Sequence, residues 1–163
     1  MPDTSMTIEQ VLTRLAATPP RFATLTASLT PAQLQQRPET DAWSANEVLA
    51  HLRAGADVWG LYIARILAED RPTFRAISPR TWMKRTNYLE LDFEPSLHAF
   101  ATQRTELLAV LEPLSSDGWS RGATVKQAGR VIEPTVLWYA ERLARHEGAH
   151  IAQVEQIVEA VCA

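Results

Sequence analysis

Apolar residues recur at every third or fourth position along most of the chain, which is the spacing of an amphipathic helix. The recurrence is strongest in four segments, residues 8–29, 45–68, 94–112 and 133–161. The chain has no sustained alternation of apolar and polar positions and no internal repeat. The pattern therefore predicts an all-α protein, a four-helix bundle with long crossover connections, formed as a single domain over residues 1–163.

Short polar motifs mark the start of three predicted helices. Residues 7–10 (Thr-Ile-Glu-Gln) and 44–47 (Ser-Ala-Asn-Glu) have the form of a capping box, in which the first and fourth side chains satisfy backbone N–H groups. Thr30 followed by Pro31 predicts an N-cap with proline at the first helical position, and so a short helix. The helix that begins after Ser44 is expected to end near Ala68.

Other segments predict interruptions of the helices. Residues 18–20 (Thr-Pro-Pro) predict a break or kink, because proline in a helix interior costs about 3 kcal/mol. Residues 71–92 predict a long, partly helical connection, and connections of this length are often functional. Residues 116–119 predict a turn, and residues 121–131 predict a loop or a short ribbon.

Composition narrows the class of protein. The chain has 163 residues, of which 46% are hydrophobic and 21% are charged, as in ordinary globular proteins. Its formal net charge of −3 gives no positive field that would attract nucleic acid or an anionic membrane, so neither is expected as a partner. The longest strong apolar run, residues 136–140, is far shorter than the ~20 residues of a membrane helix, and no signal-peptide pattern is present. A soluble cytoplasmic protein is the expectation.

The four histidines suggest a metal site. His146 and His150 are one helical turn apart, about 40° from each other on the helix surface, so both imidazoles can reach one ion. His51 lies near the start of the second long helix, toward its apolar face. Three imidazoles bind a divalent metal as neutral donors and leave open positions for water or a thiolate. The alternative is that these residues only line the rim of the bundle, and His98, which has no partner at ligand spacing, is expected to be solvated.

Glu147 falls close to the centre of the apolar stripe of the last helix, where a carboxylate is costly unless it is paired. It could orient a metal-binding imidazole, transfer protons as a catalytic base, or pair with an arginine from another helix. Residues 146–150 also match the H-E-x-x-H pattern of zinc metalloproteases, although no longer metzincin pattern follows. The single cysteine, Cys162, is terminal, so a metal site would depend on imidazole and carboxylate groups.

Two blocks of the sequence resemble the DinB/YfiT-like superfamily. Residues 43–52 (WSANEVLAHL) are similar to its W-S-x-x-E block ending in histidine, and residues 146–153 (HEGAHIAQ) are similar to its H-x-x-x-H-x-x-Q block. The resemblance implies a four-helix bundle with an unusual crossover topology. It also implies a divalent metal, nickel or zinc, held by His51, His146 and His150, and a homodimer.

The resemblance further implies an enzyme that acts on a small molecule, such as an S-transferase or isomerase that uses a low-molecular-weight thiol like mycothiol or bacillithiol. Arg80, Lys84 and Arg85 could meet carboxylates of such a molecule or simply be solvated, and Gln153 could make an ordinary helix-surface hydrogen bond. Two alternatives remain open. One is a non-catalytic module that binds metal or a small ligand as a stress-related sensor, and the other is a metal-dependent hydrolase of the H-E-x-x-H kind.

Overall fold

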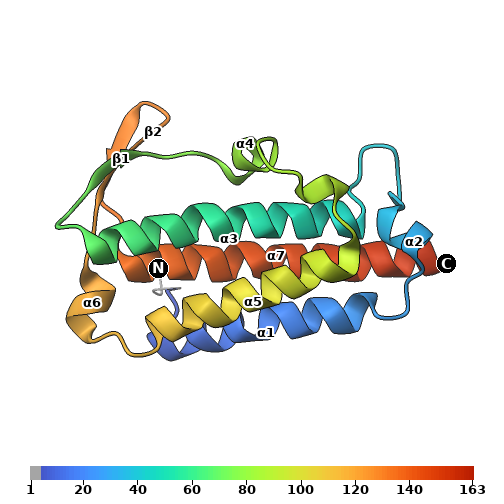
Figure 1. Cartoon of the computed structure of the whole chain (residues 1–163), viewed down its shortest axis with the longest axis horizontal. Coiled ribbons are helices and arrows are strands. Elements are labelled where there is room, and N and C mark those ends of the chain that lie inside the picture. Colours follow the sequence, from blue (N-terminus) through green and yellow to red (C-terminus); the bar gives the residue numbers. More distant parts are fainter. Residues whose placement is uncertain (1–4) are drawn as a thin grey trace.

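Four long helices run side by side along the long axis of the molecule in a computed structural model, which describes residues 5–163 (Figure 1). They are α1 (Ile8–Thr26), α3 (Ala45–Ala68), α5 (Phe93–Leu111) and α7 (Val136–Cys162). Four short helical elements lie between them: α2 (Pro31–Gln35), α4 (Pro79–Met83), η1 (Tyr88–Glu90) and α6 (Ser116–Ser120). The described strands are β1 (Thr73–Arg75), β2 (Thr124–Gln127) and β3 (Arg130–Ile132). The predicted all-α four-helix bundle is confirmed, with a small sheet at one end.

The topology of the bundle comes from a long crossover. Helix α1 packs against α5 and α7, and α3 packs against the same two helices, so α1 and α3 occupy opposite corners. Helices α3 and α5 run in the same direction, because the chain between them travels back along the outside of α3 (Figure 1). Helix α4 packs on α3 within this connection. The crossover therefore places residues 71–92 over the helix that carries His51.

The helix starts follow the motifs in the sequence. Thr7, Thr30 and Ser44 each accept a hydrogen bond from the backbone N–H three residues later, and the side chain at that later position accepts one from the backbone of the cap. Each capping box satisfies two N–H groups that would otherwise lack a partner at the helix end. Helix α3 ends at Ala68, as predicted.

Two local predictions need correction. At residues 18–20 the predicted break is wrong, because helix α1 continues through Pro19 and Pro20, whereas the alternative of a kink stays a prediction. Pro19 has no N–H to donate to the Leu15 carbonyl one turn earlier, and Arg104 on α5 donates to that carbonyl instead, at 2.9 Å. The segment predicted as a turn at residues 116–119 is the short helix α6, in which the Gly118 N–H donates to the capping side chain of Ser115.

The interior of the bundle is apolar, with large side chains such as Leu15, Phe22 and Phe100 completely enclosed. Each such side chain contributes roughly 1.5–3 kcal/mol when it is buried. The few buried polar side chains are therefore conspicuous, and Arg104 and Glu147 are among them. Within residues 5–163, no helix is long and apolar enough to span a membrane.

The small sheet joins two distant segments. Strand β1 pairs in parallel with β2, and β2 pairs antiparallel with β3, so the segment predicted as a loop or short ribbon is a hairpin. The hairpin turns through two residues with positive φ, Ala128 at 44° and Gly129 at 77°. Positive φ at both positions is the requirement of a type I′ turn, which favours Asn-Gly over Ala-Gly.

Replacing Ala128 with asparagine is expected to stabilise the protein. Asparagine adopts the left-handed conformation more easily than alanine, so the free energy of unfolding should rise by about 0.5–1 kcal/mol in urea titrations. Ala128→Val is the matched control, because a β-branched residue at positive φ is more strained and should lower the same quantity. Equal stabilities of the three proteins would contradict this account of the turn.

Candidate metal centre

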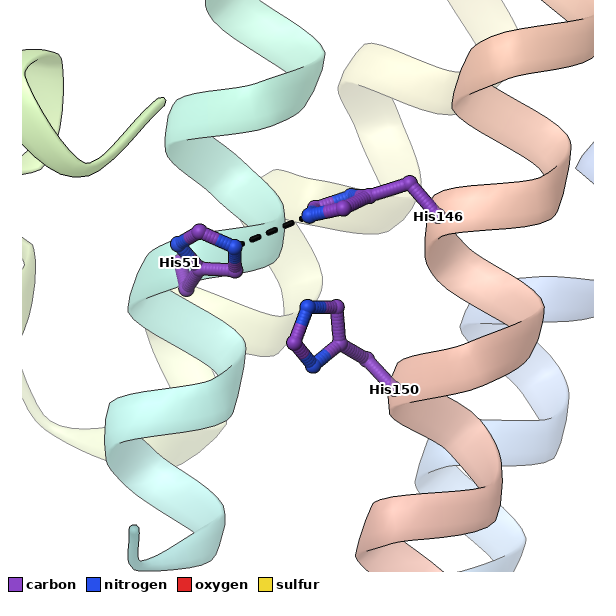
Figure 2. Close-up of side chains that lie close together, drawn as sticks. All are labelled: His51, His146 and His150. Carbon is purple, nitrogen blue, oxygen red and sulfur yellow. Dashed lines mark hydrogen bonds between the residues drawn. The ribbon is translucent and has the colours of Figure 1, made fainter. Parts of the chain in front are cut away.

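The three histidines singled out by their spacing converge in the structure (Figure 2). His51 comes from α3, whereas His146 and His150 are one turn apart on α7. One nitrogen from each ring can be chosen so that all three lie within 4.8 Å of one another. The Nε2 atoms of His51 and His146 are 2.9 Å apart. His98, in contrast, is exposed to solvent near the start of α5, as expected.

The donor set fits a divalent ion of borderline softness. Imidazole nitrogens suit zinc and nickel, and nitrogens bound to one ion at about 2.0–2.1 Å lie at most about 4 Å apart. The three nitrogens, within 4.8 Å of one another, are close to that spacing. Within residues 5–163, the buried Nδ1 atoms of His51 and His146 have no hydrogen-bond partner. The Nε2 contact between these two rings is the one polar contact that an ion would replace.

The ring of His150 is oriented by a neighbour on the same helix. Its Nδ1 lies 2.7 Å from Oε1 of Gln153. An amide oxygen only accepts, so Nδ1 carries the proton and Nε2 keeps the lone pair that a metal needs. Gln153 thus does more than make the ordinary surface hydrogen bond considered from the sequence, because it fixes the tautomer of a candidate ligand.

Two tryptophans enclose the imidazoles. The ring of Trp43 stacks on His150, with centroids 6.0 Å apart and planes inclined by 10°, and it meets His51 edge-on at 5.0 Å. Trp59 meets His146 edge-on at 4.9 Å. Gly55 on α3 lies against these rings, where a Cβ would make an ordinary van der Waals contact of 3.4 Å with Cε1 of His146. The sequence analysis missed Gly55 and Trp59 as site residues.

Burial keeps the imidazoles of His51 and His146 neutral. Loss of solvent is the main cause that lowers the pKa of His51 to about 4, with smaller contributions from His150 and the cationic Arg80. Burial likewise lowers the pKa of His146 to about 3, assisted by the other two histidines and by Arg142. Neutral imidazole is the form that binds a metal, so these two rings are ready to act as ligands at neutral pH.

Glu147 lies in the core rather than in contact with solvent, and its exposed side-chain fraction is 0%. Arg104 donates to both of its oxygens: Nη1 donates to Oε1 at 2.6 Å, and Nη2 donates to Oε2. Of the three roles considered from the sequence, this contact corresponds to the pairing with an arginine. In the described part of the chain no hydrogen bond joins Glu147 to a histidine, and its role in proton transfer stays a prediction.

The cations of the crossover differ in position. The guanidinium of Arg80, at the start of α4, lies 5.2 Å from the ring centre of Trp43 and therefore borders the histidine cluster. Lys84 and Arg85 are exposed beyond the end of the same helix. Trp43, two residues before α3, forms part of the wall of the site.

Removing the carboxylate of Glu147 is expected to destabilise the protein. Glu147→Gln leaves the buried charge of Arg104 without a counter-ion, so the free energy of unfolding should fall by about 3–5 kcal/mol in urea titrations. The matched control is Glu155→Gln, which breaks an exposed pair between α7 and Arg21 on α1 and should cost less than about 1 kcal/mol. Equal losses in the two variants would show that the Arg104 pair has no special structural role.

Comparisons with known proteins agree with this architecture. A search of curated proteins found no significant match. The solved structure of YfiT from Bacillus subtilis is similar, with a TM-score of 0.80 and 19% sequence identity over 96% of this chain and 90% of that one. YfiT is described as a probable metal-dependent hydrolase with an unusual four-helix bundle topology, and at this identity the likeness shows the fold. The model of the DinB superfamily matches residues 14–154, a span that includes all three converging histidines. The chain therefore belongs to the DinB superfamily.

Proposed function

We propose that this protein is a divalent-metal-dependent enzyme that acts on a small molecule, with His51, His146 and His150 as the metal ligands. The observation that carries the proposal is the convergence of three imidazoles from α3 and α7, two of which, His51 and His146, have a pKa lowered by burial. A cavity of about 570 Å³ reaches the cluster at His146. Three protein ligands leave positions of the ion open, as catalytic sites require.

When bound, such an ion supplies a positive charge that lowers the pKa of a thiol or a water at an open position. The chain's own residues orient the ligands, exclude water and place positive charge beside the cluster. Gln153 fixes the tautomer of His150, and Trp43 and Trp59 exclude water from two sides. Arg80 and Arg142 place positive charge at the border of the cluster, where an anionic group can be held.

Within this class we favour a thiol-dependent S-transferase or isomerase that uses nickel or zinc. Three neutral ligands leave the charge of the ion undiminished, which favours an anion such as a thiolate as the exogenous ligand. The chain's own thiol is poorly placed for this role, because Cys162 is twelve residues beyond His150, about 18 Å along α7. A separate low-molecular-weight thiol would therefore supply the sulfur.

Metal-dependent hydrolysis is the second candidate, favoured by the description of YfiT and by the ability of the same open positions to hold water. The H-E-x-x-H chemistry of zinc metalloproteases is less well supported, since it needs the glutamate as a free base and both oxygens of Glu147 accept from Arg104. A module that only binds metal or a small ligand is the remaining alternative.

Metal binding is expected to depend on the three histidines. The purified protein loaded with zinc or nickel should carry one ion per chain by elemental analysis, and the His51→Ala/His150→Ala double variant should carry almost none. Gln153→Ala should keep the stoichiometry but weaken the affinity about 10–100-fold, because the partner that orients His150 is lost. His98→Ala is the control and should match the wild type. A double variant that carries as much metal as the wild type would refute the assignment.

Turnover separates the candidate functions. A panel of low-molecular-weight thiols is combined with epoxides and maleylpyruvate-like acids, and a set of small esters and amides is tested without thiol. We expect thiol-dependent product formation that is lost in His51→Ala/His150→Ala. Thiol-independent cleavage of an ester or amide would favour the hydrolase. A metal-dependent rise in melting temperature without turnover of any pair would favour the binding module.

A further inference from the structure

A second cavity, of about 620 Å³, lies beside the small sheet at one end of the bundle (Figure 1). Two tyrosines line it, Tyr62 on α3 and Tyr139 on α7, although only 6% and 2% of their surface is exposed. Their ring centres are 5.3 Å apart. A buried tyrosine hydroxyl ordinarily has a hydrogen-bond partner, so the partners of these two hydroxyls show what the pair is for.

The hydroxyl of Tyr139 lacks a partner in the protein. Within residues 5–163 it makes no hydrogen bond, and its oxygen does not belong to the fully enclosed polar atoms that lack a partner. The small surface that Tyr139 keeps therefore includes the hydroxyl, and Tyr139 lines the cavity. A hydroxyl that is removed from water and left unpaired costs free energy. A molecule in the cavity can supply the partner that the protein does not.

The hydroxyl of Tyr62 is used only as an acceptor. The backbone N–H of Ile77 donates to it at 2.7 Å, and the ring stacks on Phe74 in β1 with centres 4.5 Å apart. These contacts hold the ring in place, but in the described part of the chain nothing accepts the proton of the hydroxyl. None of the described residues that line the cavity is Asp or Glu. The second hydroxyl therefore also has a proton to donate.

Both hydroxyls keep that proton at neutral pH. Burial raises the pKa of Tyr62, against a smaller opposite effect of the hydrogen bond from Ile77. Burial is also the main cause that raises the pKa of Tyr139, and the neighbouring Tyr62 adds to it. A neutral phenol donates one hydrogen bond. The group that pairs with these two tyrosines must therefore bring an acceptor oxygen.

Indole rings form the apolar part of the wall. Trp59 and Trp138 line the cavity, and the guanidinium of Arg142 lies 5.5 Å and 5.2 Å from their ring centres. A few polar groups over an apolar wall are typical of sites for small organic molecules. Trp59 also meets His146 edge-on at 4.9 Å and lines the cavity that reaches His146. One indole thus borders both the tyrosine pair and the candidate metal centre.

We infer that the cavity beside the sheet binds a small organic molecule with an apolar body, and that the hydroxyls of Tyr62 and Tyr139 donate hydrogen bonds to an acceptor oxygen of that molecule, such as a carbonyl oxygen. Binding depends on the two hydroxyls and the indole wall. That the bound molecule is the one transformed at the histidines rests on the proposed function.

The test compares two probes of one shape that differ in the acceptor oxygen. Fluorescence titrations use the ketone 2-acetyl-6-(dimethylamino)naphthalene and the corresponding 2-ethyl compound, which has no oxygen. We expect the ketone to bind about tenfold more tightly, because the ethyl compound leaves the buried hydroxyls unpaired. Equal binding of the two probes to the wild type would overturn the inference.

Removal of one hydroxyl assigns the preference to the cavity. Tyr139→Phe should bind the ketone about tenfold more weakly, bind the ethyl compound as the wild type does, and melt at the same or a higher temperature, because this hydroxyl has no partner in the protein. The matched control is Tyr88→Phe, which removes a hydroxyl that donates to Asp57 at 2.5 Å. It should leave ketone binding unchanged and lower the melting temperature. Unchanged ketone binding in Tyr139→Phe, or a lower melting temperature of that variant, would contradict the inference.

The other hydroxyl combines both effects. Tyr62→Phe should weaken ketone binding by a similar factor, and its melting temperature should fall because the Ile77 N–H loses its acceptor. Ketone binding to Tyr62→Phe that equals the wild type would exclude this hydroxyl from the site.

This inference and the proposed function fail separately. The same titrations with His51→Ala/His150→Ala should keep the preference for the ketone, because the tyrosines are unchanged. Loss of that preference in a wild-type protein that carries one metal ion would contradict the tyrosine site alone. A preference that persists in a wild-type protein that binds no metal would contradict the proposed function and support the tyrosine site.

Discussion

One buried guanidinium connects three of the four long helices. Arg104 on α5 binds the carboxylate of Glu147 on α7 and the carbonyl of Leu15 on α1, and both charged side chains are almost completely enclosed. Taking two charges out of water is costly, and an apolar pair of similar size often gives equal or greater stability. The Arg104–Glu147 pair instead positions the helices relative to one another. It fixes the rotation of α7, and Glu147 directly follows His146 in the sequence, so the same contact holds the face of α7 that carries His146 and His150 toward α3.

The sequence predicts the features that local signals determine. Capping motifs at Thr7 and Ser44 and the spacing of His146 and His150 depend on neighbours within one helical turn, and all of them match the structure. The continuity of α1 is different, since the donor that compensates for Pro19 comes from a residue 89 positions away from Leu15. The strands have three or four residues, too few for an alternating pattern to appear. Trp59 follows His51 and Gly55 at steps of four residues, a signal that an ordinary apolar stripe also gives.

The contact between His51 and His146 joins positions 95 residues apart in the chain. An ion held by both would act as a reversible cross-link and close a loop that contains α5, the crossover and the whole sheet. In the chain-entropy description, closing a loop of about 100 residues removes about 4.7 kcal/mol of freedom from the unfolded state. Unlike a disulfide of that span, however, the ion is released when the chain unfolds and its ligands separate, so it would stabilise the fold by its binding free energy, in a protein whose single cysteine cannot form a disulfide within the chain.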